Sequence, residues 1–172
     1  HDLQAIMDFT LNTLVNKLGM ADSLIFLWDE PSQYYALRAH NGVSQEQIET
    51  IEERRRSGFD FIQQVADSDQ ELFVPNLEFD NRVNWTWKNL KDRSYISFPL
   101  KSRGKIVGVM EAVTHNGHIL SSQEVEFLKA IGQQVGSAID NELLIEESRL
   151  NELESSTLYR FGISISKSLS MN

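Results

Sequence analysis

A ten-residue stretch with apolar side chains on both of its faces most strongly limits how this chain can fold. In residues 105–114, the two faces of an extended strand are both apolar, with Ile106, Met110 and Ala112 on one and Val107, Val109 and Val113 on the other. Residues 94–100 are also apolar, and the polar residues 101–104 join the two segments as a hairpin. A strand that is apolar on both faces is covered on both faces. The sequence therefore predicts that residues 105–114 form a central strand.

A long helix is predicted after this hairpin. Residues 121–124 form a capping box, in which the Ser121 hydroxyl accepts from the Glu124 amide and the Glu124 side chain reaches back. Apolar residues follow at helical spacing, at Val125, Leu128, Ile131, Val135, Ile139 and Leu143. Gly132 and Gly136 lie on one helix face, which predicts close packing within the domain or across a dimer.

The other elements are read from the same signals. Residues 3–18 show a helical stripe that ends at Gly19, and residues 24–28 and 34–39 read as two strands of a hairpin. Helices are expected over residues 44–58 and 59–66, and a short strand over 72–74. The connection over residues 76–92 is long for a compact domain, which is typical of a lid or a functional loop. Its two tryptophans, Trp85 and Trp87, have two interpretations, a lid over a pocket or ordinary core.

Composition excludes several classes of protein. The net charge of −9 argues against a nucleic-acid partner, because binding to the phosphate backbone needs clustered Lys and Arg. The absence of cysteine removes thiolate metal sites and cysteine nucleophiles, and it fits a cytoplasmic location. No apolar run is long enough to span a membrane, so no membrane insertion is expected. No phosphate-cradling loop, nucleophile elbow or kinase motif is present, so we predict no catalytic residue and no enzyme activity in this chain.

Glu111 is the one carboxylate on the otherwise apolar central strand. A buried acid must be hydrogen-bonded or paired, since its desolvation is otherwise costly. Two interpretations follow: Glu111 binds a ligand donor, or it forms a structural ion pair with Arg93 or Arg103. The run Arg54, Arg55 and Arg56 ends an acidic helix and is interpreted as complementing the helix dipole.

Residues 115–118, His-Asn-Gly-His, could be taken for a pair of metal ligands. The Asn-Gly between the histidines is turn chemistry, and no further Cys or His lies close by in the sequence. We therefore interpret His115 and His118 as solvated turn residues and predict no metal site.

Four stretches of the sequence resemble a known family. The segments "SFPLKSRGKIVGVMEAVT" and "SSQEVEFLKAIGQQVGSAIDNELL", together with "SLIFLWDE" and "FVPNLEFDNR" upstream, are similar to those of GAF domains over residues 3–145. The resemblance implies an α+β fold, with a central antiparallel sheet and helices on both faces. The terminal helices would pack together on one face and a small-molecule pocket would lie on the other. The implied ligand-binding residues are Phe26, Trp28, Phe61, Val65, Trp85, Trp87, Ser97 and Glu111.

The known uses of the fold can be compared with this sequence. Bilin attachment and methionine-sulfoxide reduction in this family use cysteines, which the chain lacks. In GAF domains that bind cyclic nucleotides, a Glu at the position of Glu111 can contact the base. Their Asn-Lys, Phe and Asp-Glu signature is replaced here by Thr114-His115, Ile119 and Gln123-Glu124, which argues against that ligand. Haem stays open, since His40 and His115 could serve as ligands, and the ligand or cofactor is left unidentified.

We therefore predict a three-part chain. Residues 1–142 are a GAF-like sensory domain, residues 143–156 a connector helix, and residues 157–172 the start of a following helix or module. The predicted function is that of a ligand-binding regulatory domain of a cytoplasmic signalling protein, such as a two-component sensor histidine kinase or a nucleotide cyclase. It would bind an unidentified small molecule and relay its state through a homodimeric connector helix. The alternative is a ligand-free module for dimerisation and signal relay.

Overall fold

The computed structural model describes residues 2–82 and 89–170, so Trp85 and Trp87 lie outside the described residues. A helix opens the described chain, a much longer helix closes it, and the strands and shorter helices lie between them. The elements are α1 (Asp2–Lys17), β1 (Met20–Asp29), β2 (Tyr34–Asn41), α2 (Gln45–Arg56), α3 (Phe61–Ser68), β3 (Leu72–Val74), the 3-10 turn η1 (Leu77–Phe79), β4 (Tyr95–Ser102), β5 (Lys105–Thr114) and α4 (Ser122–Leu169).

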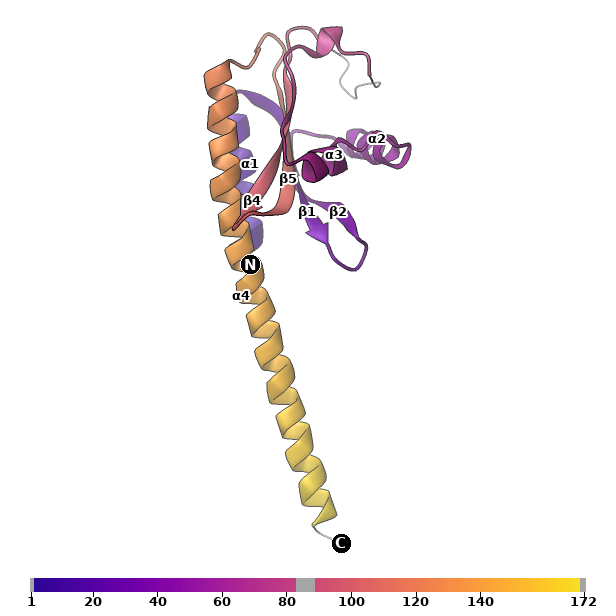
Figure 1. The fold of residues 1–172 in the computed structure, drawn as a ribbon, viewed down its shortest axis with the longest axis vertical. Coiled ribbons are helices and arrows are strands. Elements are labelled where there is room, and N and C mark those ends of the chain that lie inside the picture. Colours follow the sequence, from indigo (N-terminus) through magenta and orange to yellow (C-terminus); the bar gives the residue numbers. More distant parts are fainter. Residues whose placement is uncertain (1, 83–88, 171–172) are drawn as a thin grey trace.

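The five strands form one antiparallel sheet in the order β2-β1-β5-β4-β3. β5 therefore lies at the centre, as its two apolar faces predict, with β1 on one side and β4 on the other. Figure 1 shows three layers, with α1 and α4 on one side of the sheet and α2 and α3 on the other. This is the α+β arrangement expected from the sequence.

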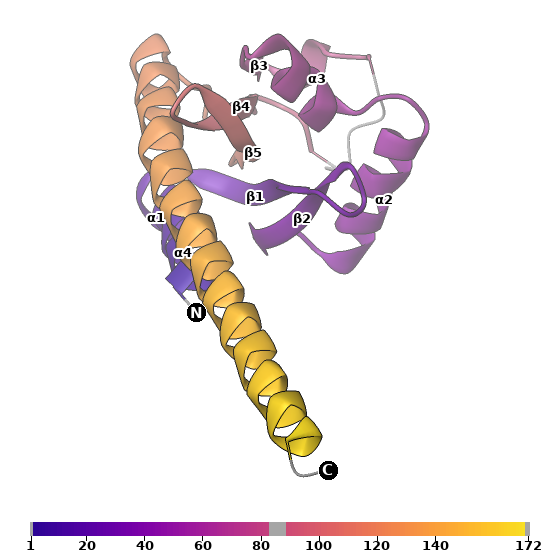
Figure 2. The same ribbon diagram turned by 60° about the horizontal axis from the view of Figure 1, so that its bottom comes forward.

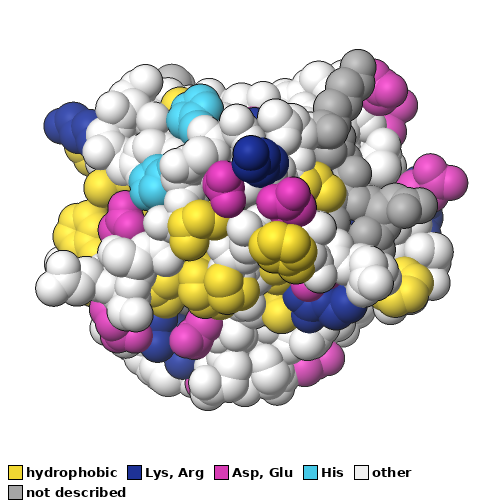
Figure 3. All heavy atoms as spheres, turned by 90° about the horizontal axis from the view of Figure 1, so that it is seen from above, with side chains coloured by type: hydrophobic (Ala, Val, Ile, Leu, Met, Phe, Trp, Pro, Cys, Tyr) yellow, Lys and Arg dark blue, Asp and Glu magenta, His cyan; other side chains and the backbone are white. Residues whose placement is uncertain are grey.

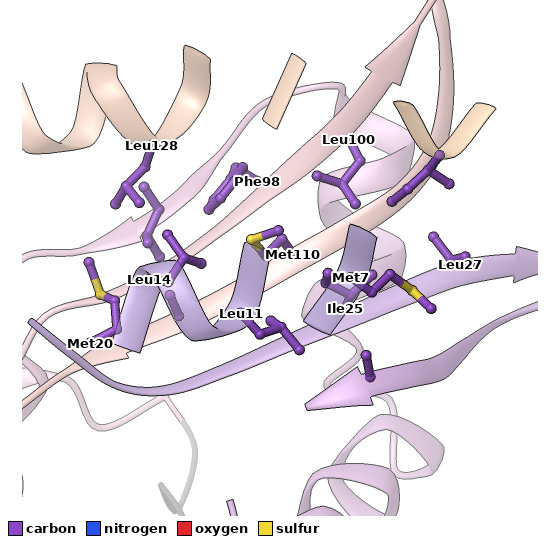
Figure 4. Packing of buried hydrophobic residues seen from close by; sticks show 14 of the residues in the cluster. Met7, Leu11, Leu14, Met20, Ile25, Leu27, Phe98, Leu100, Met110 and Leu128 are labelled. Atoms are coloured by element: carbon purple, nitrogen blue, oxygen red, sulfur yellow. The ribbon is translucent and has the colours of Figure 1, made fainter. Parts of the chain in front are cut away.

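The face of the sheet under α1 and α4 is covered by an aliphatic core. Met7, Leu11 and Leu14 of α1 and Leu128 of α4 close onto side chains of the central strands (Figure 4). The strand residues in this core include Ile25, Leu27, Ile96, Phe98, Leu100, Met110 and Ala112.

Two glycines let α4 lie directly against β4. A Cβ at Gly132 would lie 2.8 Å from the Phe98 ring, and one at Gly136 would collide with the backbone N and O of Lys101. The alternative left open by the sequence is decided in favour of packing within the domain.

The opposite face is covered by two short helices with well-defined starts. Ser44 and Gln47 form a capping box at the start of α2. The helix expected from residue 59 begins at Phe61, because Asp60 is its N-cap and accepts from the Gln63 amide. The predicted boundary was therefore two residues early.

α4 is 48 residues long and extends far beyond the sheet (Figures 1 and 2). Its capping box at Ser121 and Glu124 is present as predicted. Up to Leu143 the helix contributes side chains to the core, and every described residue from Leu144 onward is exposed. The helix runs through positions 143 and 157 without a break, so the division there stays a prediction. None of the described helices has the length and apolar character of a membrane span.

Candidate functional site

Glu111 lies in the middle of β5 on the face that α2 and α3 cover. Its neighbours in the sheet are Leu24 on β1 and Ser97 on β4. The residue is 1% exposed, and the Tyr95 hydroxyl donates a hydrogen bond to its Oε1. Arg54 Nη2 lies 3.7 Å from the same oxygen. Glu111 is thus a buried carboxylate between a hydroxyl and a guanidinium.

The predicted partners of Glu111, Arg93 and Arg103, were wrong. Arg93 precedes β4, and its backbone forms an isolated β-bridge with His118. Arg103 lies in the β4–β5 turn and pairs with Asp140 at 3.3 Å. They flank opposite ends of the hairpin, whereas Glu111 is in the body of its strand. The partner comes instead from α2, which lies over that face of the sheet (Figure 1).

Burial dominates the acid–base properties of this group of side chains. Desolvation raises the pKa of Glu111, and the charge of Arg54 and the Tyr95 hydrogen bond act in the opposite direction. Desolvation also raises the pKa of Tyr95 well above its usual value, and the charge of Glu111 adds to this shift. The phenol therefore keeps its proton and acts as the donor in the pair.

Arg54 contacts both the acid and an aromatic ring. Its side chain is 7% exposed, and its guanidinium carbon lies 4.8 Å from the centre of the Phe61 ring. This distance is within the range of a cation–π contact.

Arg55 links α2 to β2 and to the start of α3. Its Nη2 donates to the Tyr35 carbonyl at 2.9 Å, Nε donates to Asp60 at 3.0 Å and Nη1 donates to Glu52 at 2.9 Å. Its guanidinium also stacks over the rings of Tyr34 and Phe26. The arginine run lies in the last turn of α2, as its interpretation as a complement to the helix dipole requires. Arg54 and Arg55 are also buried against the domain, while Arg56 is exposed.

The sequence contains a weak signal that Arg54 and Arg55 face the interior of the domain. Residues three and four positions apart lie on the same side of a helix, so the spacing of Arg54 and Arg55 from an apolar residue carries this signal. An apolar residue, Ile51, marks the buried side of α2 and lies three and four positions before Arg54 and Arg55.

The structure brings five of the eight predicted ligand-binding residues onto one face of the sheet. Phe26, Phe61, Val65 and Ser97 are buried on the same side as Glu111, within or beside two apolar clusters. Glu111 and Tyr95 lie where these clusters meet, since Val109 belongs to one and Val113 to the other. The role of the five in binding a ligand stays a prediction.

Trp28 lies apart from this group, near the turn of the β1–β2 hairpin. The residue is 36% exposed, and its ring packs edge-on against Tyr35 and donates from Nε1 to Glu30 at 2.6 Å. Trp85 and Trp87 lie outside the described residues.

A cleft of about 470 Å³ opens beside Arg54. Its lining residues come from the end of α2 and from the segment after η1: Thr50, Glu53, Arg54, Ser57, Phe59, Asn81 and Arg82. Glu111 and Phe61 are not among them. Arg54 therefore stands between the open cleft and the buried carboxylate.

The histidines lie elsewhere. His115 and His118 belong to the turn at the end of the molecule where α4 begins, and Figure 3 views this end with histidine in cyan. His118 Nε2 lies 2.8 Å from Glu124, the carboxylate of the α4 capping box, and His115 is exposed. Among residues 2–82 and 89–170, no three His, Cys, Asp or Glu side chains are grouped as metal ligands would be.

Known structures share this fold. The chain is similar to the GAF domain of a phosphoenolpyruvate-protein phosphotransferase from Acinetobacter, at 18% identity and a TM-score of 0.64, over 83% of this chain and 85% of that one. It is also similar to a type II free methionine-R-sulfoxide reductase from Thermoplasma acidophilum, at 10% identity and a TM-score of 0.65, over 81% and 93%. A methyl-accepting chemotaxis protein matches at 16% identity and a TM-score of 0.60, over 84% and 92%.

Sequence comparison points the same way. No curated protein matches the chain significantly. The family model of the GAF domain matches residues 1–140, which include the whole sheet, Glu111 with its neighbours Tyr95, Arg54 and Phe61, and the part of α4 that packs on β4. The chain therefore belongs to the GAF domain family.

Proposed function

We propose that this GAF domain is a regulatory module of a signalling protein, and that it passes its conformational state to an output domain along α4 in a dimer. The observation that carries the proposal is the continuity of α4. One helix packs on the sheet through Gly132 and Gly136 and then leaves the domain as far as Leu169. A rigid helix that is fixed at one end transmits a tilt or a rotation to whatever follows it.

The outer part of α4 supports pairing with a second copy of this chain. Leu150, Phe161 and Ile165 lie on one side of the helix and are 67%, 68% and 50% exposed. Such an apolar stripe in water marks an interaction surface. Two parallel copies would bury it as a coiled coil does, and the proposed connector would occupy residues 143–156.

A groove between α1 and α4 is a second apolar surface, on the domain itself. It is lined largely by apolar or small side chains, including Ala5, Ile6, Val135 and Ala138. Phe9 on α1 is 73% exposed beside it. In a symmetric pair, the same groove of a second copy would bury it.

Strand β4 gives a route from the Glu111 side to α4. Tyr95 and Ser97 lie on the Glu111 face, while the alternate residues Ile96 and Phe98 belong to the core beneath α1 and α4. A displacement of Tyr95 therefore moves a strand that α4 contacts directly. Packed elements of this kind switch between discrete arrangements rather than deforming continuously.

Ion pairs add a second route around the edge of the sheet. Lys101 Nζ lies 2.6 Å from Asp69, which caps the end of α3, and Lys129 Nζ on α4 lies 3.1 Å from Glu71. These pairs connect the helix that covers the ligand side to the helix that leaves the domain. They are partly exposed, so their contribution to stability is small, but they still orient the two elements.

A relay module without a ligand is the second candidate. It is favoured by the filling of the space beside Glu111 with the side chains of Arg54, Tyr95 and Phe61. Native mass spectrometry of the purified domain distinguishes the candidates. A co-purified small molecule supports ligand sensing, and a bare polypeptide mass favours the relay.

Analytical ultracentrifugation tests the dimer. The intact chain should sediment as a dimer at high micromolar concentration, and a Leu150→Lys, Phe161→Lys variant should be monomeric. The matched control carries Glu152→Lys and Ser156→Lys, which lie on the other side of the helix and should leave the dimer intact. A monomeric intact chain, or equal loss of the dimer in both variants, would contradict the proposal.

A further inference from the structure

The ion pair between Arg54 and Glu111 is longer than the contacts that its neighbour Arg55 makes. The Nη2 to Oε1 distance of 3.7 Å exceeds that of a hydrogen bond, whereas Arg55 makes three hydrogen bonds of 2.9–3.0 Å. Arg55 is thus held by direct hydrogen bonds, whereas Arg54 and Glu111 form an ion pair at a longer distance. Arg55 fixes α2 in place, and Arg54 fills the space between the carboxylate and the cleft.

The surroundings of the Arg54 guanidinium define the chemistry that this space accepts. Glu111 presents a carboxylate, the Phe61 ring lies 4.8 Å from the guanidinium carbon, and the ring of Tyr95 packs beside Phe61 with its centre 6.2 Å away. A carboxylate together with an aromatic wall binds flat cations that carry N–H donors.

The cleft beside Arg54 would give a ligand access from solvent to the space beside Glu111. It has a volume of about 470 Å³, and its lining includes Arg54, which pairs with Glu111, and Arg82, whose guanidinium carbon lies 5.8 Å from the centre of the Phe61 ring. Displaced from Glu111, the Arg54 side chain has room to move into this space. Phe59, which is 50% exposed in the lining, offers an apolar surface to the rest of a ligand.

We propose that Arg54 is an internal plug in a pocket for a small ligand with a planar amidinium or guanidinium group. The ligand takes the place of Arg54 between Glu111 and Phe61, and Arg54 turns outward into the cleft. This inference rests on the ligand-sensing form of the proposed function and names the chemical class of the ligand.

The exchange keeps the charge of the site balanced because it replaces one planar cation with another. Removing a positive charge from a buried carboxylate is strongly unfavourable when nothing takes its place. A cationic ligand restores the charge balance, so Glu111 never stands alone in the interior. A neutral or anionic ligand offers no such compensation.

Benzamidine and methylguanidine are suitable probes, at low millimolar concentration, with the intact chain. In Arg54→Ala the internal competitor is gone, so binding measured by calorimetry should be at least about tenfold tighter than in the wild type. Arg54→Ala combined with Glu111→Gln should lose this gain. Arg56→Ala, which removes an exposed arginine from the same run, should bind the probes as the wild type does.

Benzamide tests the requirement for charge, since it matches benzamidine in shape and is neutral. It should bind Arg54→Ala at least about tenfold more weakly than benzamidine does. If Arg54→Ala binds neither cation, or if adding Glu111→Gln to it leaves the affinity for both cations unchanged, the inference is wrong.

A second measurement covers the case in which Arg54→Ala does not fold. In the wild type, the side-chain Nε–H resonance of Arg54 should shift on titration with benzamidine, while that of Arg55 stays in place. An unchanged Arg54 resonance at saturating probe overturns the inference. Such a failure in a chain that still sediments as a dimer removes only the ligand class, and the relay along α4 is tested separately by the Leu150→Lys, Phe161→Lys variant.

Discussion

The two faces of the sheet are built on different principles. Under α1 and α4 the buried side chains are almost entirely apolar, and two glycines bring α4 onto the backbone of β4. Under α2 and α3 the apolar side chains share the interior with a carboxylate, two guanidinium groups and a phenol. One face is stabilised by close packing, and the other depends on charges that must remain paired.

The two faces of the sheet therefore have different roles. Replacing a buried ion pair with apolar side chains of similar volume often leaves stability unchanged or increases it, so stability alone does not account for Glu111 and Arg54. The packed face holds the helix that leaves the domain. The polar face carries charged and hydrogen-bonding side chains that can bind a polar or charged group. Strands β5 and β4 lie between the packed face and the polar face.

The largest effect is expected at Arg55, which tests whether the polar face depends on its charges. Arg55→Ala removes one hydrogen-bond donor from each of Asp60, Glu52 and the Tyr35 carbonyl and leaves the two carboxylates without their buried cation, so it should lower the free energy of unfolding by about 3–5 kcal/mol. Urea unfolding at neutral pH measures it. Arg56→Ala is the control and should change stability by no more than about 0.5 kcal/mol. Similar losses in both variants would mean that the buried contacts of Arg55 add nothing.

A smaller loss is expected at Gly136, which tests the packed face. A methyl group there would meet the Lys101 backbone, so Gly136→Ala must displace α4 and should cost about 1–3 kcal/mol. Gly162→Ala places the same methyl group in open space on the same helix and should not lower the melting temperature. A Gly136→Ala protein as stable as the wild type would show that α4 does not rest on β4.

The start of α4 tests a purely local contribution to the packed face. The Ser121 hydroxyl accepts from the Glu124 amide at 3.2 Å, so Ser121→Ala should cost about 1 kcal/mol. The adjacent Ser122→Ala lacks this role and is the matched control. Equal thermal melts for the two variants would contradict the cap.

The smallest change is expected in the pH dependence of stability, and it sharpens the description of the polar face. The folded-state pKa of Glu111 is raised above its ordinary 4.5, so the folded state holds this proton more tightly than the unfolded state does. Its contribution to stability is fully present below about pH 4.5 and is lost as the pH rises through the folded-state pKa. Asp29 and Glu71 act in the opposite sense, because hydrogen bonds lower the pKa of each.

Comparison with Glu111→Gln isolates this contribution. Between about pH 4.5 and 7, the stability of the wild type relative to Glu111→Gln should fall as the pH rises. Urea unfolding of both proteins at several pH values measures the difference. A difference that grows with pH would mean that Glu111 is stabilised as a carboxylate.

Much of the architecture was predictable from the sequence because its causes are local or periodic. Apolar residues on both faces of residues 105–114 require a central strand wherever the rest of the chain lies. The capping boxes at Ser44 and Ser121 lie within four consecutive residues, so they predict helix starts without any tertiary information. The boundary of α3 was missed by two residues because Asp60 was not recognised as its cap.

The sequence by itself determined that Glu111 must have a partner, and only the tertiary structure decided which. The demand for a partner follows from the cost of burying a charge, which depends on the residue and its strand. The identity of the partner depends on where α2 crosses the sheet, and that placement is set by Ile51, Ile62 and the other side chains packed beneath the helices. The Gly136 contact with Lys101 is of the same kind: spacing predicted close packing, and the position of α4 on β4 selected the surface that it meets.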